Sequence, residues 1–274
     1  MPKFLRNSLS LMPNKIPSKT IKTQKIYSPH SGKKISRVAL LTGCVQRVIS
    51  PEINEATIRL LNRHNVEVVV MPDIECCGSL NHHLGKKEKA EKSFVKNIKS
   101  WHSEYLTNGL DAIISNTSGC GTTLKDYGHI FRNDKELKKQ AKKMSELTKD
   151  ITEYLDENLK LNIKKNKEKK YKIAYHSACS MQHGQRIHDQ PKQLISKTGN
   201  EVLDIPEGHL CCGSAGTYNI LHQKMAKSLL KNKVSNIEKV EPDFISTGNI
   251  GCMTQISCRD KIRFNLFNIT YFIF

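Results

Sequence analysis

The sequence has few acidic residues, few aromatic residues and no long apolar run. Its 274 residues include 44 Lys and Arg against 26 Asp and Glu, which gives a formal net charge of +18. Because the uninterrupted apolar runs are short, we expect no transmembrane helix. The N-terminus has no apolar segment of the secretory type, so no export signal is predicted, although its basic, acid-free composition also fits an organellar transit peptide.

The excess positive charge lies in two short stretches. Residues 1–37 hold nine Lys and Arg and no acid, and residues 159–172 hold seven and one, which leaves a charge of about +3 for the rest of the chain. Aromatic residues make up only 6% of the sequence, and no basic–aromatic alternation suited to base stacking is present. We therefore predict a solvated basic arm, a basic linker and no nucleic acid partner. A basic polyanion-binding module remains a less favoured alternative.

Cysteine is the residue around which the sequence is organised. Eight of the nine cysteines form two quartets with matching spacings, C-x31-C-C-x42-C and C-x31-C-C-x39-C. The first quartet is Cys44, Cys76, Cys77 and Cys120, and the second is Cys179, Cys211, Cys212 and Cys252. This register predicts an internal duplication in which the repeated object is a cysteine site.

Four thiols at these spacings can form a structural zinc site, disulfides or an iron–sulfur site. Structural zinc favours C-x2-4-C pairs, which are missing here, and disulfides suit small secreted domains. An iron–sulfur cluster accepts thiolates from well-separated segments, so it is the favoured prediction, with zinc and disulfides as the alternatives. Adjacent cysteines reach one site only through an unusual turn, which Gly78 and Gly213 can supply with positive φ.

Strands are predicted to alternate with helices in the first half of the chain. Apolar runs predict strands at 37–42, 66–71 and 111–115, and helical spacing predicts helices at 52–64, 86–105 and 132–157. Every cysteine of the first quartet follows the C-terminal end of a predicted strand. Since parallel α/β sheets carry their sites at that edge, the pattern predicts a Rossmann-like parallel sheet with the cysteines gathered there.

The second half repeats this order. Strands are predicted at 172–176, 201–205 and 243–246, and a long helix at 214–234 with Ser214 as a candidate N-cap. The predicted fold class is α/β, with two tandem parallel-sheet domains at 37–157 and 171–257. We predict a basic arm at 1–36, a linker at 158–170 and an atypical tail at 258–274. The tail contains the ninth cysteine, Cys258, to which we assign no ligand role.

The sequence around the cysteines resembles a known family. The segments are LTGCVQR around Cys44, NTSGCG around Cys120, YHSACS around Cys179 and CCGSAGTYN from Cys211. They resemble the CCG cysteine-rich domain family, which includes the cysteine-rich component of heterodisulfide reductase, lactate utilisation protein A and the glycolate oxidase iron–sulfur subunit. The similarity is strongest to the C-terminal two-thirds of the glycolate oxidase subunit and extends over residues 38–256.

The resemblance implies an iron–sulfur electron-transfer subunit of a glycolate oxidase or dehydrogenase-type complex, with one or two [4Fe–4S] clusters bound by the eight cysteines. It implies flavin-binding glycolate oxidase subunits as partners and electron passage toward quinone. The implied location is the cytoplasm or the inner face of the membrane, and the chain alone is expected to be inactive. In glycolate oxidase subunits a ferredoxin-like domain precedes this region. Its C-x2-C-x2-C-x3-C-P runs do not occur here, so we expect that domain on another chain, or this chain to be a truncated or frame-shifted fragment.

The main alternative is a thiol–disulfide enzyme that resembles heterodisulfide reductase. Such sites carry a further cysteine three positions before the last one, where this chain has Thr117 and Asn249. Four cysteines per site are the number that an ordinary [4Fe–4S] cluster needs. His176 and His183 flank Cys179 and are candidates for donating hydrogen bonds to cluster sulfurs or relaying protons, although such histidines often have only a structural role.

Overall fold

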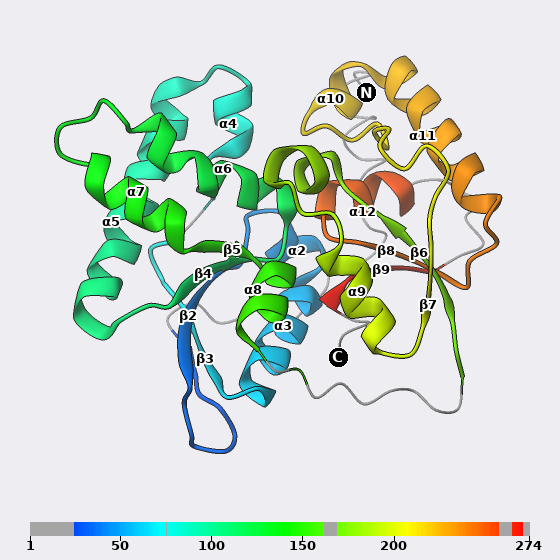
Figure 1. The fold of residues 1–274 in the computed structure, drawn as a ribbon. Helices are drawn as coiled ribbons and strands as arrows, with labels where there is room; N and C mark the ends of the chain where they lie inside the picture. Colours follow the sequence, from blue (N-terminus) through cyan, green and yellow to red (C-terminus); the bar gives the residue numbers. More distant parts are fainter. Residues whose placement is uncertain (1–24, 75, 160, 162–168, 258–264, 271–274) are drawn as a thin grey trace. The chain divides into compact units, whose positions relative to one another are not determined.

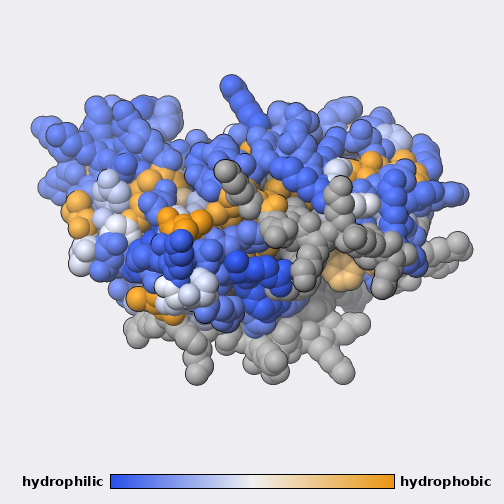
Figure 2. Space-filling view, turned by 60° about the horizontal axis from the view of Figure 1, so that its bottom comes forward, coloured by the Kyte–Doolittle hydropathy of each residue, from blue (hydrophilic) through white to orange (hydrophobic). Residues whose placement is uncertain are grey.

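The computed structural model describes residues 25–74, 76–159, 161, 169–257 and 265–270, which form two α/β units (Figure 1). One unit contains the described residues up to Leu161, and the other contains those from Lys169 onward. Among the described helices, none is both long and apolar enough to cross a membrane. Figure 2 shows a largely hydrophilic face on which small apolar patches lie between polar side chains.

The first unit is built on a five-stranded sheet with the order β1-β3-β2-β4-β5. All neighbouring strands are parallel except β1, which pairs antiparallel with β3 at one edge. The three central strands read as almost continuous apolar runs, as expected of a sheet covered by helices on both faces. The strands are β1 (Lys25–Tyr27), β2 (Ser36–Leu41), β3 (Val66–Val70), β4 (Ala112–Ser115) and β5 (Thr148–Asp150).

The long helix predicted at 86–105, after the Cys-Cys pair, is present and packs through one apolar face. Its residues Ala90, Phe94, Ile98 and Trp101 are all buried in the core of the unit. The helices of this unit are α2 (Gln46–Ile49), α3 (Pro51–Arg63), α4 (Ser79–His83), α5 (Lys87–Asn108), α6 (Ser118–Ile130), α7 (Lys138–Leu147) and α8 (Ile151–Asn158).

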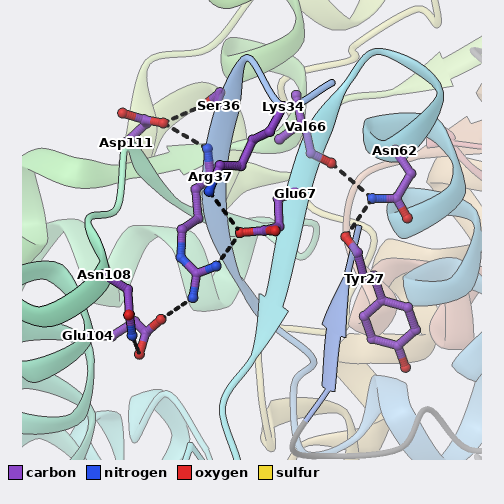
Figure 3. Close-up of polar contacts among 10 residues, drawn as sticks. All are labelled: Tyr27, Lys34, Ser36, Arg37, Asn62, Val66, Glu67, Glu104, Asn108 and Asp111. Carbon is purple, nitrogen blue, oxygen red and sulfur yellow. Dashed lines mark hydrogen bonds and ion pairs between the residues drawn. The ribbon is translucent and has the colours of Figure 1, made fainter. Parts of the chain in front are cut away.

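An ion-pair network lies at the amino-terminal end of β2 (Figure 3). Arg37 is 8% exposed, and its guanidinium pairs with Glu67 on β3 and Glu104 on α5. Asp111 accepts hydrogen bonds from the Arg37 backbone N–H at 2.7 Å and from the Ser36 hydroxyl at 2.8 Å. The buried cation is therefore compensated by two carboxylates, and the network fastens β2 to its neighbours at the edge opposite the cysteines.

The second unit has a four-stranded, fully parallel sheet with the order β7-β6-β8-β9. Its strands are β6 (Lys172–His176), β7 (Glu201–Leu203), β8 (Phe244–Thr247) and β9 (Asn265–Asn268). Its helices are the π-helix η1 (Ser180–Gln185), α9 (Gln190–Lys197), α10 (Tyr218–Leu221), α11 (Gln223–Glu238) and α12 (Ile250–Ser257). The predicted α/β class with two tandem parallel-sheet domains is confirmed.

The predicted bounds of two helices were wrong. The helix expected at 132–157 is interrupted by β5, because Thr148–Asp150 pairs with β4 and Asp150 then begins α8 with a capping box that includes Glu153. The helix expected at 214–234 starts only at Gln223, after the short α10. Ser214 is not its N-cap, since positive φ values at Ala215 and Gly216 are incompatible with a continuing helix.

Two segments assigned outside the domains belong in part to the sheets. Lys25–Tyr27, placed in the arm, forms β1, and the Tyr27 carbonyl accepts a hydrogen bond of 2.7 Å from the Asn62 side chain (Figure 3). Asn265–Asn268, placed in the tail, forms β9 beside β8. Both strands are too short to show an alternating pattern. The rest of the arm up to residue 24, most of the linker, and residues 258–264 and 271–274 lie outside the described residues.

Candidate metal centres

The first quartet converges at the C-terminal edge of the first sheet. Cys44 follows β2, Cys76 and Cys77 follow β3, and Cys120 lies in the first turn of α6 beyond β4. The Sγ atoms of Cys44 and Cys76 are 3.4 Å apart, and the Cys77 thiol interacts with those of Cys76 and Cys120. The four thiols therefore form one continuous group, which we call the first centre.

The second quartet converges in the same way and forms the second centre. The Cys211 thiol interacts with those of Cys179 and Cys212, and the Cys212 thiol also interacts with that of Cys252. All eight quartet cysteines are free thiols, so the disulfide alternative is not realised at either centre. Cys258 lies outside the described residues.

A glycine with positive φ turns the chain after each Cys-Cys pair, as the sequence predicted. Gly78 has φ +80° and Gly213 has φ +91°. The N–H of Gly78 donates to Cys76 Sγ at 3.4 Å, and that of Gly213 donates to Cys211 Sγ at 3.2 Å. This turn directs two neighbouring side chains toward one site and also supplies a backbone donor to a sulfur.

A buried amide network supports the loops of the first centre. The Gln46 side-chain amide donates to Asn54 Oδ1 at 2.8 Å and to Asn116 Oδ1 at 2.6 Å, and the Asn116 amide donates to Thr57 Oγ1 at 2.9 Å. Gln46 follows Cys44 by two residues, and Asn116 precedes Cys120 by four. The network therefore connects two cysteine-bearing loops through α3, and its polar groups satisfy one another in the interior.

Different contacts support the second centre. Asn249 caps α12, because its Oδ1 accepts hydrogen bonds from the backbone N–H groups of Gly251 at 2.8 Å and Cys252 at 3.3 Å. Cys179 is followed at once by the π-helix η1, and the Gln182 amide on η1 donates to the Ser177 carbonyl at 3.1 Å. Single-turn π-helices occur often at functional sites.

The neighbouring thiols of each quartet shift one another's pKa. A hydrogen bond from Cys44 lowers the pKa of Cys76 to about 2, and one from Cys179 lowers the pKa of Cys211 to about 2. The donors Cys44 and Cys179 have raised pKa values for the same reason. Metal ions bind thiolates and displace the remaining thiol protons. Closely packed thiols of which some are deprotonated are therefore stabilised when a metal binds. The donor set therefore fits a metal centre.

The donor types bear on which metal fits. Each centre combines four sulfurs from three separate segments, which is the arrangement that iron–sulfur clusters accept. At the second centre a ring nitrogen of His176, Cys212 Sγ and Cys252 Sγ also lie within 4.8 Å of one another. Nitrogen and sulfur donors together are ligands that zinc takes as well, so zinc remains the alternative there. His183, the other candidate, is exposed on η1.

Sequence reasoning missed a lysine beside the second centre. Lys233 on α11 is only 2% exposed, and its ammonium donates to the carbonyls of Glu207 at 3.1 Å and Gly208 at 3.3 Å. It interacts electrostatically with all four thiols of the second quartet. The spacing along the helix could have indicated that Lys233 is buried, because it lies seven residues after the buried Ala226 and so on the same face of α11.

Comparisons with known proteins find similar chains among iron–sulfur subunits. The chain is 37% identical over 243 residues to the glycolate oxidase iron-sulfur subunit of Escherichia coli (strain K12), and 29% identical over 257 residues to the probable glycolate oxidase iron-sulfur subunit of Bacillus subtilis (strain 168). The matched regions cover 89% and 93% of this chain but only 58% and 57% of those proteins. The chain thus spans little more than half the length of these relatives.

Two further matches support the fold. Lactate utilization protein A of Oceanobacillus iheyensis is 26% identical over 225 residues, which cover 81% of this chain and 89% of that protein. The crystal structure of a hypothetical protein from Helicobacter pylori aligns with a TM-score of 0.62 at 12% identity, and the alignment covers 97% of this chain and 52% of that one. At this identity the structural match shows the fold alone.

The family assignment rests on the repeated domain. The cysteine-rich domain of the CCG family matches residues 38–125 and again residues 173–257, and together these regions make up more than half of the chain. The first region contains the whole first centre and the second region contains the whole second centre. The chain therefore belongs to the CCG cysteine-rich domain family.

Proposed function

We propose that the chain is the iron–sulfur electron-transfer subunit of an oxidoreductase of the glycolate oxidase type. The observation that carries this proposal is the convergence of two quartets of free thiols at matching sheet edges. The names of the relatives support iron–sulfur clusters as the group bound there. We assign one [4Fe–4S] cluster to Cys44, Cys76, Cys77 and Cys120, and one to Cys179, Cys211, Cys212 and Cys252.

When bound, such a cluster supplies reversible one-electron storage. The residues of the chain set the conditions for it. Cys120 and Cys252 lie in the first turns of α6 and α12, and the N-terminal end of a helix dipole attracts negative charge such as that of a bound cluster. The Gly78 and Gly213 N–H groups donate to sulfur, which reduces the negative charge that the thiolates must carry.

Electron transfer also requires an accessible edge. Cys44, Cys76 and Cys120 are partly exposed at the first centre, whereas Cys77 is buried. In the segments that follow Cys44 and Cys77 in the sequence, four large apolar side chains are exposed to solvent: Val45, Val48, Leu80 and Leu84. Exposed apolar side chains in the segments that carry a partly open redox site fit transient docking of an electron donor or acceptor.

The proposed partners are flavin-binding glycolate oxidase subunits, which oxidise glycolate and pass electrons through this chain toward quinone. A separate ferredoxin-like domain would supply further clusters. We propose that the complex lies in the cytoplasm or on the inner face of the membrane. This chain would provide the thiolate ligands of the clusters and the charged groups around them, while the flavin carries out the two-electron oxidation of glycolate.

We expect the anaerobically purified chain to reduce a quinone analogue with glycolate only when flavin-binding glycolate oxidase subunits are added. Reconstitution with a chain in which Cys77 and Cys212 are both Ser should lower quinone reduction to near the level of the flavoprotein alone. Glycolate oxidation by the purified chain without added flavoprotein would refute the assignment.

A thiol–disulfide enzyme is the second candidate, because the lowered pKa of Cys76 and Cys211 is what a thiolate nucleophile requires. Under this alternative, the purified chain would reduce a disulfide substrate with a thiol donor, and replacing both Cys76 and Cys211 by Ser would abolish that activity. The electron-transfer proposal expects no such turnover.

A further inference from the structure

The surroundings of the two centres differ in charge, although the cysteines themselves are equivalent. Behind the second centre lies Lys233, a buried lysine that interacts with all four thiols. Burial lowers the pKa of its ammonium, and the negative charge of the four thiolates opposes that shift. Its two hydrogen bonds to backbone carbonyls are of the kind that a protonated amine makes.

The equivalent position in the first unit is neutral. Gly213 lies against the carbonyl of Ala226, and Gly78 lies against the carbonyl of Ala90, so these alanines mark the same point on the two helices. Seven residues after Ala226 stands Lys233, and seven residues after Ala90 stands Asn97.

Asn97 performs a comparable structural task without a charge. It is buried, and its side-chain amide donates to the Cys76 carbonyl at 2.9 Å and to the Tyr127 hydroxyl at 3.1 Å. The Tyr127 hydroxyl in turn donates to the Cys77 carbonyl at 2.8 Å. The first centre is therefore backed by neutral hydrogen-bonding groups, whereas the second is backed by an ammonium.

A second difference lies three residues before the first cysteine of each quartet. In the second unit this residue is His176, which is 1% exposed and has a ring nitrogen within 4.8 Å of Cys212 Sγ and Cys252 Sγ. Among the residues that the structure describes, neither ring nitrogen has a hydrogen-bond partner of normal geometry, although a contact with His176 helps to lower the pKa of Cys252. In the first unit the residue is the buried, apolar Leu41.

A buried imidazole N–H without a partner is costly, and the neighbouring sulfurs are available to accept from it. Hydrogen bonds to cluster sulfurs raise the reduction potential of a cluster, and so does a nearby buried cation, because both stabilise the additional negative charge of the reduced state. The first centre does have a cation near Cys76, namely Arg47, but that side chain is exposed and solvent screens its charge.

We infer that the two centres are electrochemically inequivalent, and that Lys233 and His176 make the second centre the stronger electron acceptor. This inference rests on the proposed function, in which each quartet holds an iron–sulfur cluster. Lys233 and His176 act here as positioning and tuning residues, and the cysteines remain the ligands. The second centre would then be the point at which electrons collect within the chain, whichever of the two receives them first.

Single-centre proteins allow the two potentials to be measured separately. Cys77→Ser removes a ligand of the first centre and leaves the second, and Cys212→Ser does the reverse. In anaerobic redox titrations followed by EPR, we expect the remaining centre of the Cys77→Ser protein to be reduced at least tenfold more readily than that of the Cys212→Ser protein. Tenfold corresponds to about 59 mV for one electron. Equal midpoint potentials would overturn the inference.

Variants of the tuning residues complete the test in the Cys77→Ser background. Lys233→Met and His176→Leu should each lower the midpoint potential of the second centre, and Lys233→Arg should retain it because the charge is kept. Lys231→Met is the matched control, since it removes an exposed lysine from the same helix. If Lys233→Met does not fold, Lys233→Gln removes the charge while keeping a donor.

The outcomes separate this inference from the function on which it rests. Lys233 variants that shift the potential no more than Lys231→Met would show that the buried charge does not tune the centre, and would overturn the inference while leaving the clusters in place. Single-centre proteins that contain neither iron nor acid-labile sulfide would instead refute the proposed function, and this inference with it.

Discussion

The Cys77→Ser protein, purified without oxygen, should contain about half the iron and acid-labile sulfide of the unchanged chain, because it keeps only one of two equivalent four-thiolate sites. Cys77 is buried, and its thiol contacts both Cys76 and Cys120, so its loss leaves a gap in the middle of the quartet. Cys212→Ser should have the same effect at the second centre. The double variant should contain almost no iron.

The ninth cysteine provides the matched control for this experiment. Cys258→Ser removes one thiol from outside both quartets, and we expect its iron content to equal that of the unchanged chain. Iron and sulfide assays on the four variants and the unchanged chain make the comparison direct. If Cys77→Ser retained its full iron content, or if Cys258→Ser lost as much as Cys77→Ser, the quartets would not be the ligand sets.

Gly213→Ala should be among the most destabilising single substitutions in the second unit. A Cβ at this position would lie 2.4 Å from the Ala226 carbonyl oxygen, and the backbone has φ +91°, where residues with a side chain are strained. Because the obstructing atom belongs to the backbone of α11, it cannot move aside as a flexible side chain would. We expect a loss of about 3 kcal/mol or more, together with loss of the second metal centre.

Gly85→Ala separates the close contact from the backbone strain. Gly85 also has positive φ, at +72°, but a Cβ there would have no atom of the described residues within 4 Å. This variant should therefore show only the strain, about 1 kcal/mol. Chemical denaturation of the metal-free proteins measures both losses, and equal losses in the two variants would show that the approach of α11 to Gly213 has no energetic role.

The position of the two centres was predictable because it depends on features that the sequence shows directly. Apolar runs ending shortly before Cys44, Cys76 and Cys120 predict buried strands, and parallel strands bring their carboxyl ends to one edge of the sheet. The turn at Gly78 was predictable for a similar reason, since adjacent cysteines can face one site only if the chain turns sharply between them and the following helix.

Short strands were not predictable, because their stability comes from tertiary pairing. Thr148–Asp150 has no apolar alternation and lies between two helical segments, so periodicity alone joined these into one helix. Asn265–Asn268 lies in a segment that departs from the family pattern, yet it pairs with β8. In both cases the exposed edge of an existing sheet determines the structure more strongly than local propensity.

The groups that distinguish the two centres were only partly visible in the sequence. His176 stood out because it lies three residues before Cys179, but the sequence could not show that it is buried against two thiols. Lys233 resembled an ordinary surface lysine in a lysine-rich helix. A lysine is rarely buried unless it has partners, and here the partners are carbonyls and thiols from distant segments that the sequence does not place beside it. Only the fold brings Lys233 to the second quartet.

The central claim is that each quartet holds an iron–sulfur cluster. The most direct test is metal and acid-labile sulfide analysis of the anaerobically purified chain, combined with EPR after reduction. Two filled centres predict iron and sulfide in equal amounts, about four of each per quartet, and a reduced-cluster EPR signal. Zinc bound in place of iron without acid-labile sulfide, or no bound metal at all, would contradict the claim.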